Sequence, residues 1–367
     1  MAPVSAVPWI VLCETERSRW GGDLRRRHVF AVLAERTAAT SVQGWTRNAL
    51  AGGLRRTVGF PYPLRPPWRP RPLVASSEFL TPGGVGILRR HATGAVLDVH
   101  DHPVIQAEAL GHPHAPKAAA ALADRVARNL EAFRVLVVPS ASFADLARID
   151  PARRLVAPNG TDTQRVTPRP FPDRPAIGFV SGAAPGRGIE LLVEAARSLR
   201  AELPELRLFL WLAAGSPEGE AYVAELRAAC GDAAWIEIGA APYERLADEL
   251  GRATVLVVPH PANPYFDVAV PVKLLDSMAS GRPVAVTPRT ETRRIVETCD
   301  AGLVAGGDSA DDLAEAIRTL LLDGALAARL GANGRAAAER TYDWRVIASS
   351  VAEGVLERIR PDVVGAA

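Results

Sequence analysis

The sequence predicts an α/β fold with two domains of similar size. Over most of the chain, short apolar patterns typical of buried strands alternate with patterns typical of amphipathic helices, which favours parallel sheets built from βαβ units. The 367 residues suffice for two domains that each bury their own core. Residues 167–175 are proline-rich and have the composition of a linker. We therefore expect domains at residues 1–166 and 176–340, followed by a terminal segment at 341–367.

The elements of both halves follow in alternating order. In the first half we expect strands at 9–13, near Thr40, at 96–99 and at 134–138, with helices at about 23–36 and 115–133. The proline-rich run 61–72 fits neither a helix nor a central strand, so we interpret it as an exposed loop. In the second half we expect strands at 176–180, 207–213, near 235–238 and at 254–259, with helices at 189–203, 221–229 and near 244–252. Two Rossmann-like sheets facing across a cleft would follow.

Composition is typical of a soluble globular protein, with 48% hydrophobic and 23% charged residues. The net charge of +2 gives no reason to expect nucleic acid as a partner. Cys13, Cys230 and Cys299 show no metal-ligand spacing, which favours a reduced, cytoplasmic chain. The apolar run 7–13 lacks the features of a signal peptide, and no apolar stretch reaches the ~20 residues that span a bilayer. The basic triplet 25–27 could meet an anionic inner-membrane surface, although a solvated helix face explains it more simply.

Residues 271–286 are the most informative stretch of the chain. They follow the buried strand pattern at 254–259 and open a short helix that carries Lys273 and Asp276. Ligands of α/β proteins bind at the carboxyl ends of the strands, so these two side chains are candidate ligand-binding residues. Lys273 is one of only two lysines, with Lys117, among 43 basic residues, which indicates a position that uses a compact point charge.

A second candidate lies in residues 178–188, a glycine-rich loop between a strand and a helix. Backbone amides and the helix dipole can meet an anion there, with Ser181, Gly182 and Arg187 at hand. The loop lacks the GxGxxG spacing of the dinucleotide-binding fold, so NAD is disfavoured.

Two polar segments of the first half are further candidates. Gly21 and Gly22 follow the first strand, where glycine allows close backbone approach to a ligand. His100 and Asp101 end a later strand in a segment dense in titratable groups. A zinc site built from these two with His102, and with His112 or His114, is a weaker alternative because all the ligands come from one loop.

The order of strand, proline-rich loop, Pro-x-Lys-x-x-Asp, small-residue helix and Gly-x-Pro-Val strand resembles the nucleotide-sugar site of retaining GT-B glycosyltransferases of family 4, the group 1 glycosyltransferases. Residues 155–162 resemble the family's Pro-Asn-Gly-x-Asp turn. The resemblance implies that Gly21 and Gly22 border the acceptor and donor sugar, that His100 binds a donor-sugar hydroxyl, and that Asp101 fixes its tautomer or binds the acceptor. It also implies that the terminal helix, residues 344–359, returns to the first domain, with an ordinary closing helix of the second domain equally open.

The chain departs from the family's pattern at two positions. Ser181 stands where an arginine is expected, so Lys273 would supply the missing charge beside Arg187. Asp276 matches the second of two family glutamates and would accept hydrogen bonds from ribose hydroxyls. The first glutamate is absent in register, where Val268 stands next to Asp267, which we regard as a donor-binding candidate.

The resemblance implies a retaining, metal-independent glycosyltransferase that moves a sugar from a nucleotide-diphosphate sugar to a hydroxyl of a glycan, a lipid-linked or a small-molecule acceptor. Such an enzyme needs no cofactor beyond its donor substrate. Two alternatives stay open on the sequence: a catalytically silent nucleotide-sugar-binding subunit of a partner enzyme, and a nucleotide-sugar epimerase or hydrolase of the same fold.

Overall fold

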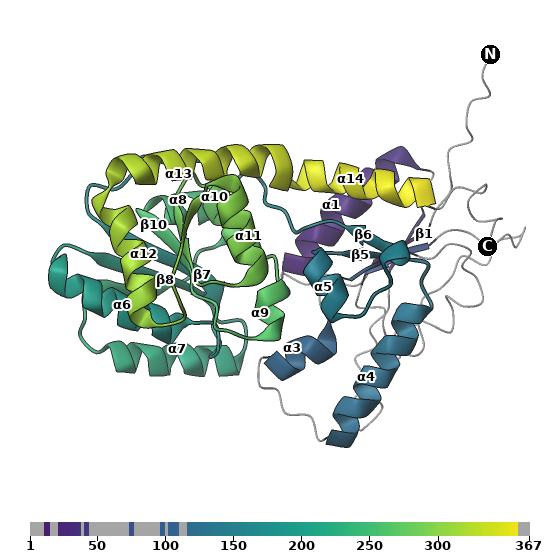
Figure 1. Cartoon of the computed structure of the whole chain (residues 1–367), viewed down its shortest axis with the longest axis horizontal. Coiled ribbons are helices and arrows are strands. Elements are labelled where there is room, and N and C mark those ends of the chain that lie inside the picture. Colours follow the sequence, from purple (N-terminus) through teal and green to yellow (C-terminus); the bar gives the residue numbers. More distant parts are fainter. Residues whose placement is uncertain are drawn as a thin grey trace, which may run out of the picture. The chain divides into compact units, whose positions relative to one another are not determined.

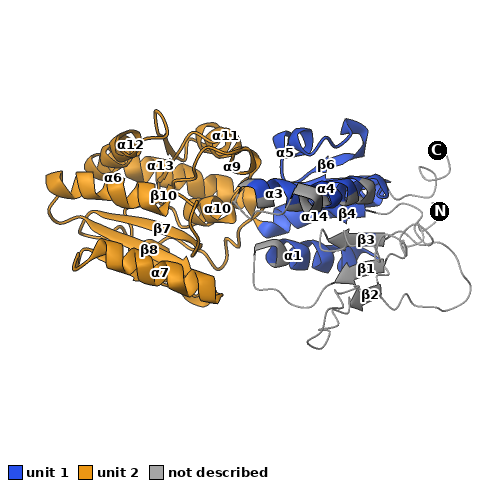
Figure 2. Ribbon diagram, turned by 90° about the horizontal axis from the view of Figure 1, so that it is seen from below, with its two compact units in different colours: residues 1–158, 344–367 blue, residues 159–343 orange. Residues whose placement is uncertain are grey.

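The protein has an α/β fold organised in two compact units. This computed structural model describes residues 11–14, 21–37, 40–43, 73–76, 96–99, 102–109 and 116–358. Unit 1 contains residues 1–158 and 344–367, and unit 2 contains residues 159–343 (Figures 1 and 2). The predicted fold class is confirmed. The proline-rich run 61–72 lies outside the described residues.

Unit 1 is built on a parallel sheet whose described strands follow the order β2-β1-β3-β4-β5-β6. The strands are β1 (Val11–Glu14), β2 (Thr40–Gln43), β3 (Leu73–Ser76), β4 (Val96–Asp98), β5 (Val135–Val138) and β6 (Arg154–Val156). The helices are α1 (Gly21–Arg36), α3 (Pro103–Ala109), α4 (Pro116–Glu131), α5 (Ala141–Leu146) and α14 (Trp344–Arg358), with a 3-10 turn at Pro151–Arg153. Every residue of β4 and β5 is buried, as in a sheet covered on both faces.

Helix α14 follows unit 2 in the chain but packs in unit 1. Its apolar face, including Trp344 and Val351, joins one hydrophobic cluster with Val29 and Leu33 of α1. Gly354 allows a close approach, because a Cβ there would lie 2.7 Å from the Leu155 side chain. Of the two arrangements that the sequence left open, the structure has the one in which the terminal helix returns to the first unit.

Unit 2 also has a parallel sheet, with the order β12-β11-β10-β7-β8-β9. Its strands are β7 (Ala176–Gly182), β8 (Arg207–Ala213), β9 (Ile236–Gly239), β10 (Val255–Val258), β11 (Val284–Val286) and β12 (Gly302–Val304). Its helices are α6 (Ile189–Glu202), α7 (Pro217–Cys230), α8 (Leu246–Gly251), α9 (Pro264–Val268), α10 (Val272–Ala279), α11 (Thr290–Cys299), α12 (Ala310–Leu322) and α13 (Gly324–Ala337), with a 3-10 turn at Tyr243–Arg245 and a π-turn at Ala338–Tyr342.

The sheet of unit 2 separates two hydrophobic clusters. Leu208 and Leu210 of β8 join one cluster, whereas Phe209 and Trp211 join the other, because successive side chains of a strand point to opposite faces. Helices α6 and α12 contribute to the first cluster, and α8, α10 and α11 contribute to the second. A sheet covered on both faces explains why its strands appear in the sequence as continuous apolar runs.

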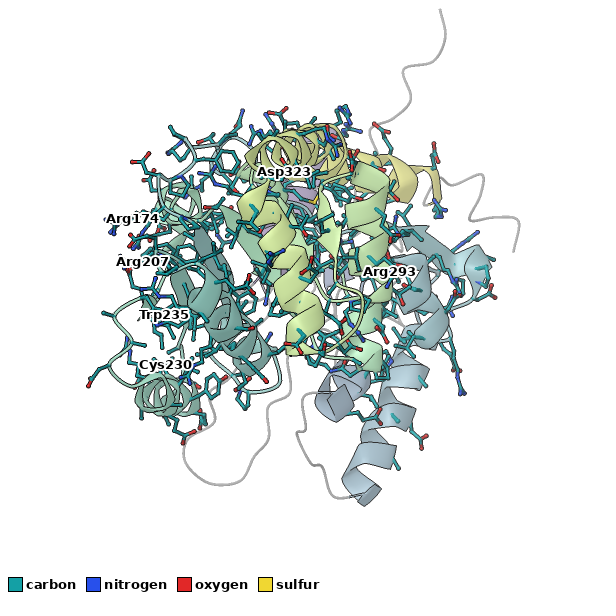
Figure 3. The ribbon with its side chains drawn as sticks, turned by 60° about the vertical axis from the view of Figure 1, so that its left-hand side comes forward. Arg174, Arg207, Cys230, Trp235, Arg293 and Asp323 are labelled. Atoms are coloured by element: carbon teal, nitrogen blue, oxygen red, sulfur yellow. The ribbon has the colours of Figure 1, made fainter. Side chains whose placement is uncertain are left out.

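Several arginines of unit 2 are exposed at its surface. Figure 3 labels two of them, Arg174 and Arg293. Arg174 forms an ion pair with Glu205 at 3.5 Å, and Arg293 forms one with Glu297 at 3.9 Å. Exposed pairs of this kind contribute little to stability, about 1 kcal/mol or less each.

The division between the units differs from the predicted one. The chain leaves unit 1 after Pro158, so the expected linker, residues 167–175, lies within unit 2. Arg169 Nε donates to Asp248 Oδ1 at 2.9 Å, and Arg282 donates to the carbonyl oxygen of Pro170 at 2.6 Å while its guanidinium lies over the Phe171 ring. These contacts hold the proline-rich segment against its own unit, which its composition alone could not reveal.

The basic triplet 25–27 is not the exposed patch that the sequence suggested. Arg25 is fully buried and Arg26 is 7% exposed. Arg25 Nε donates to both carboxylate oxygens of Asp98 at 2.9 Å, and its Nη1 donates to the carbonyl oxygens of Ala157 and Pro158. The idea that all three arginines contact an anionic surface is therefore wrong. Among the described helices, none is both long and apolar enough to cross a membrane.

Candidate functional site

The predicted ligand-binding residues of unit 2 meet at the carboxyl ends of its central strands. Lys273, on the first turn of α10, reaches the end of β7, where its Nζ donates to Ser181 Oγ at 2.9 Å. The ammonium also lies 4.8 Å from the centroid of the Phe179 ring. Because β7 and β10 are parallel neighbours, the loops after both strands open at the same edge of the sheet.

The environment of Lys273 disfavours its charge in the absence of a ligand. Burial, and after it the positive charge of Arg187, lowers the pKa of Lys273 to about 7. An anion bound beside both side chains would reverse the second effect and raise that pKa. The pair is therefore suited to hold an anionic group.

The loop between β7 and α6 brings Arg187 over the strand end. A Cβ on Gly182 would lie 3.8 Å from Arg187 Nε, and this buried nitrogen has no hydrogen-bond partner among the described residues. Gly188 has φ of +80°, and a Cβ there would lie 1.7 Å from the Pro259 carbonyl oxygen, so only glycine fits. No side chain caps α6, which leaves the backbone amides of its first turn available to an anion.

His260 joins this group of residues, and sequence reasoning missed it. It follows β10 by two residues, is 2% exposed, and has its peptide carbonyl held by Thr287 Oγ1 at 2.6 Å. Burial first, then the charges of Lys273, Arg187 and Arg289, lowers the pKa of His260 well below its usual value. The imidazole is therefore neutral near pH 7. Its place after a buried strand was the signal that could have identified it.

Asp276 lies one turn beyond Lys273 on α10 and meets the Asn-Gly turn. Thr161 Oγ1 donates to Asp276 Oδ1 at 2.6 Å, and Asn159 Nδ2 donates to the carbonyl oxygen of Val270 at 2.7 Å. Burial raises the pKa of Asp276 to about 7; the Thr161 hydrogen bond opposes the shift and the charge of Asp162 adds to it. Two segments that the sequence singled out more than 100 positions apart are thus in direct contact.

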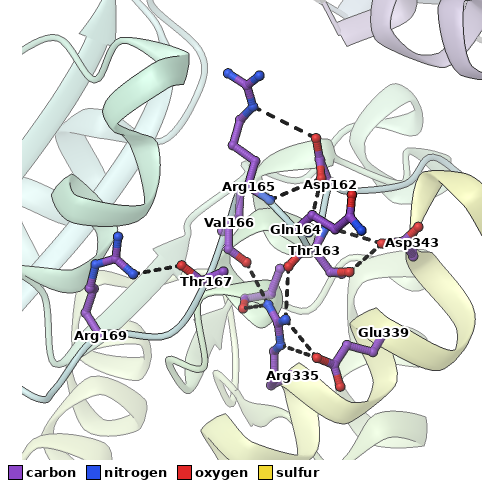
Figure 4. Close-up of polar contacts among 11 residues, drawn as sticks. Asp162, Thr163, Gln164, Arg165, Val166, Thr167, Arg169, Arg335, Glu339 and Asp343 are labelled. Carbon is purple, nitrogen blue, oxygen red and sulfur yellow. Dashed lines mark hydrogen bonds and ion pairs between the residues drawn. The ribbon is translucent and has the colours of Figure 1, made fainter.

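A second set of hydrogen bonds holds the chain after this turn (Figure 4). Arg335 donates to the carbonyl oxygens of Thr163, Val166 and Ala279, and Asp343 accepts from the Thr163 hydroxyl. The segment that presents Thr161 is therefore anchored from α13 and from the end of the unit.

Asp267, a predicted donor-binding residue, lies in an ion pair. Its Oδ1 is 3.3 Å from Arg289 Nη1, and Arg289 also pairs with Asp308. Arg289 is buried, so both carboxylates help to compensate its charge. Asp267 therefore has a structural partner in addition to any ligand.

The remaining predicted residues belong to unit 1. Gly21 and Gly22 form the start of α1, whereas His100 and Asp101 lie outside the described residues. His102 Nδ1 accepts a long hydrogen bond, 3.4 Å, from the Ile105 amide at the start of α3. Within the described ranges no three His, Cys, Asp or Glu side chains gather as metal ligands would. His112 and His114 of the zinc alternative fall outside those ranges.

Comparison of the sequence with known proteins finds glycosyltransferases. Residues 174–323 match the family model described as "Glycosyl transferases group 1". The chain is 31% identical over 279 residues to the D-inositol 3-phosphate glycosyltransferase of Geodermatophilus obscurus, covering 70% of this chain and 58% of that protein. It is 27% identical over 210 residues to the GDP-mannose-dependent alpha-(1-6)-phosphatidylinositol monomannoside mannosyltransferase of Mycobacterium tuberculosis. This match covers 53% of this chain and 54% of that protein. The chain thus spans little more than half the length of these relatives.

Solved structures of low sequence identity share the whole fold. Sucrose-phosphate synthase from Thermosynechococcus elongatus superposes with a TM-score of 0.71 at 20% identity, covering 96% of this chain and 98% of that one. The Anabaena protein HepE, solved in complex with UDP, gives a TM-score of 0.67 at 15% identity over 95% and 100% of the two chains. At these identities the likeness establishes the GT-B fold.

Proposed function

Because residues 174–323 place this chain among the group 1 glycosyltransferases, we propose that the protein transfers a sugar from a nucleotide-diphosphate sugar to an acceptor hydroxyl. The observation that carries the proposal is the contact between Lys273 and Ser181 at the carboxyl end of β7, beside Arg187. These cationic side chains and the uncapped start of α6 offer a diphosphate the donors that it needs.

The nucleoside part of the donor would bind at Asp276. Its carboxylate can accept hydrogen bonds from both ribose hydroxyls, and Thr161 holds one of its oxygens in place. Ligand hydroxyls that donate to the carboxylate would lower the raised pKa of Asp276 and so favour the charged form.

In the proposed reaction the bond between the sugar C1 and the departing phosphate oxygen breaks, and a bond from C1 to the acceptor oxygen forms on the same face. The acceptor proton passes to the departing phosphate, so the anomeric configuration is retained without a protein nucleophile. Lys273, Arg187 and the amides near Ser181 and Gly182 stabilise the negative charge that grows on the diphosphate. Because these groups carry that task, the mechanism requires no metal ion.

The acceptor side of the proposal rests on unit 1. Gly21 and Gly22 would border the acceptor and donor sugar, His100 would bind a donor-sugar hydroxyl, and Asp101 would orient that imidazole or bind the acceptor. Two of the similar proteins are named for inositol-containing acceptors, and one of these is named for GDP-mannose. Inositol phosphates and GDP-mannose are therefore the first acceptors and donor to try, with UDP-sugars second.

Calorimetric titration of the full chain with UDP, GDP, ADP, TDP and their sugars tests the donor site. We expect tight binding of one nucleotide, weakened by Lys273→Ala and by Asp276→Ala but not by Arg318→Ala, which removes an exposed charge on α12. Transfer to an acceptor with the donor's anomeric configuration retained, followed by NMR, tests the chemistry. Tight binding without turnover would favour a silent subunit, and no binding to any nucleotide would overturn the proposal.

A further inference from the structure

His260 is a buried polar side chain that the mechanism above does not use. It is 2% exposed, and neither of its ring nitrogens has a hydrogen-bond partner among the described residues. Its ring stacks on Phe266 with centroids 4.2 Å apart and planes 22° apart, which fixes its orientation. Buried polar atoms in proteins are nearly always paired, so two orphaned nitrogens on a rigidly held ring point to an absent partner.

The charges around His260 indicate what that partner is. Lys273 acts on it from α10, Arg187 from the loop after β7, and Arg289 from the segment after β11. The ring face is covered by apolar Phe266 of α9, and the acidic groups nearby, Asp267 and Asp308, are paired with Arg289. A surplus of positive charge around a neutral N–H donor suits an anion and opposes a metal cation.

We propose that His260 is a further diphosphate-binding residue, donating an imidazole N–H to a phosphate oxygen of the donor together with Lys273 and Arg187. The inference rests on the proposed function, because it places that donor's diphosphate at the ends of β7 and β10. His260 thus helps to bind the diphosphate that departs in the reaction. Phe266, stacked on the imidazole, holds the ring in position for that contact.

Binding would also change the protonation of the site. In the free protein the neighbouring cations keep His260 neutral and lower the pKa of Lys273 to about 7. A bound diphosphate adds negative charge beside both groups and raises both pKa values, so these two side chains contribute proton uptake from solution, whereas Asp276 contributes proton release when a nucleoside binds. A histidine that only fills space would contribute nothing to this uptake.

The test compares His260→Phe, which keeps the aromatic stack and removes both nitrogens, with His260→Gln, which keeps a donor. Inorganic pyrophosphate, UDP, GDP, uridine and guanosine are titrated calorimetrically at pH 7 in two buffers of different ionisation enthalpy. We expect His260→Phe to lower the affinity for pyrophosphate by about tenfold or more, and to lower the affinity for the preferred nucleoside diphosphate by the same factor. The variant should also reduce proton uptake and leave nucleoside binding unchanged. His260→Gln should retain more affinity than His260→Phe.

A matched control is His28→Phe, which makes the same change in another stacked histidine, in unit 1 against Trp344. It should leave pyrophosphate affinity unchanged, and thermal unfolding should show that each variant is folded. Equal binding of pyrophosphate and diphosphate by wild type and His260→Phe would overturn the inference and leave the proposed function standing. Pyrophosphate binding that depends on His260, with no nucleoside diphosphate bound more tightly than pyrophosphate, would support the anion site and overturn the proposed function instead.

Discussion

Lys273 donates a hydrogen bond of 2.9 Å to Ser181, the position at which the sequence resemblance led us to expect an arginine. The two positions are 92 residues apart in sequence, on α10 and β7. The lysine thus brings a positive charge to the strand end that lacks one of its own. The Ser181 hydroxyl accepts a hydrogen bond from the Lys273 side chain and so holds its Nζ at the strand end in the absence of a ligand.

Replacing Lys273 should affect phosphate binding in particular. Lys273→Met removes the charge and keeps most of the side-chain volume, so affinity for inorganic pyrophosphate and for the nucleoside diphosphate should fall about tenfold to a hundredfold, as for loss of a charged hydrogen bond. Calorimetric titration measures this change. Arg318→Met, on the exposed face of α12, is the control; similar losses in both variants would contradict a specific role for Lys273.

Replacing Asp276 should have the complementary effect. Asp276→Asn keeps the hydrogen bond from Thr161 but loses the carboxylate, so nucleoside and nucleotide binding should weaken about tenfold while pyrophosphate binding stays unchanged. The same titrations separate the two ligands. Asp311→Asn, an exposed carboxylate at the start of α12, serves as the matched variant, and a loss of pyrophosphate affinity in Asp276→Asn would argue against the ribose contact.

Donor affinity should depend on pH through Lys273. Its pKa is lowered to about 7 in the free protein and rises when an anion binds, so the complex holds more of its proton than the free protein does. Affinity for the nucleotide sugar, whose diphosphate does not titrate in this range, should therefore fall as pH rises above 7, by up to about tenfold per pH unit. The Lys273→Arg variant carries a side chain that does not titrate in this range, so its affinity for the nucleotide sugar should change little between pH 7 and pH 9. An equal pH dependence of affinity in wild type and Lys273→Arg would exclude Lys273 as its source.

The loop that carries Arg187 makes a prediction about stability. Gly188→Ala should lower the free energy of unfolding by about 3 kcal/mol or more, because φ is +80° and the new Cβ would overlap the Pro259 carbonyl oxygen. Gly186→Ala is the matched change, since φ is +73° but no atom lies within 4 Å of its Cβ, and it should cost only about 1 to 2 kcal/mol. Urea denaturation compares the two; equal losses would mean that the close approach at Gly188 is relieved by small shifts.

The buried ion pair between Arg25 and Asp98 in unit 1 leads to a second prediction about stability. Asp98→Asn leaves the fully buried Arg25 guanidinium without its counter-charge and should destabilise the protein by about 3 kcal/mol or more. Asp248→Asn breaks the exposed pair with Arg169 and should cost about 1 kcal/mol or less. Thermal and urea unfolding measure both, and a small effect of Asp98→Asn would show that solvent reaches Arg25.

Local sequence patterns were sufficient for most of unit 2. The strand predicted at 207–213 coincides with β8, because a sheet covered on both faces gives an unbroken apolar run. Helix α7 begins at Pro217, four residues before its predicted start, since Ser216 caps it and proline is favoured in the first helical turn. The expected helix at 244–252 is a 3-10 turn followed by the short α8, and α9 was not predicted.

The sequence located the loops of the site more readily than its interactions. Lys273 and Asp276 were evident because polar residues follow a buried strand pattern. His260 also follows a buried strand pattern, but it was overlooked because the charges that act on it, those of Lys273, Arg187 and Arg289, come from other segments of the chain. Arg25 was misjudged for the same reason: its partner Asp98 is 73 residues away, so a run of three arginines looked like a solvated face.

The return of α14 to unit 1 bears on the order in which the chain folds. Unit 2 is encoded as one continuous segment, whereas unit 1 needs Trp344 and the apolar face that follows it to cover α1. During synthesis the ribosome therefore releases all of unit 2 before it releases the helix that completes unit 1. Unit 2 can therefore fold before unit 1 is complete. Until α14 is released, the partial hydrophobic core of residues 1–158 remains exposed to chaperones.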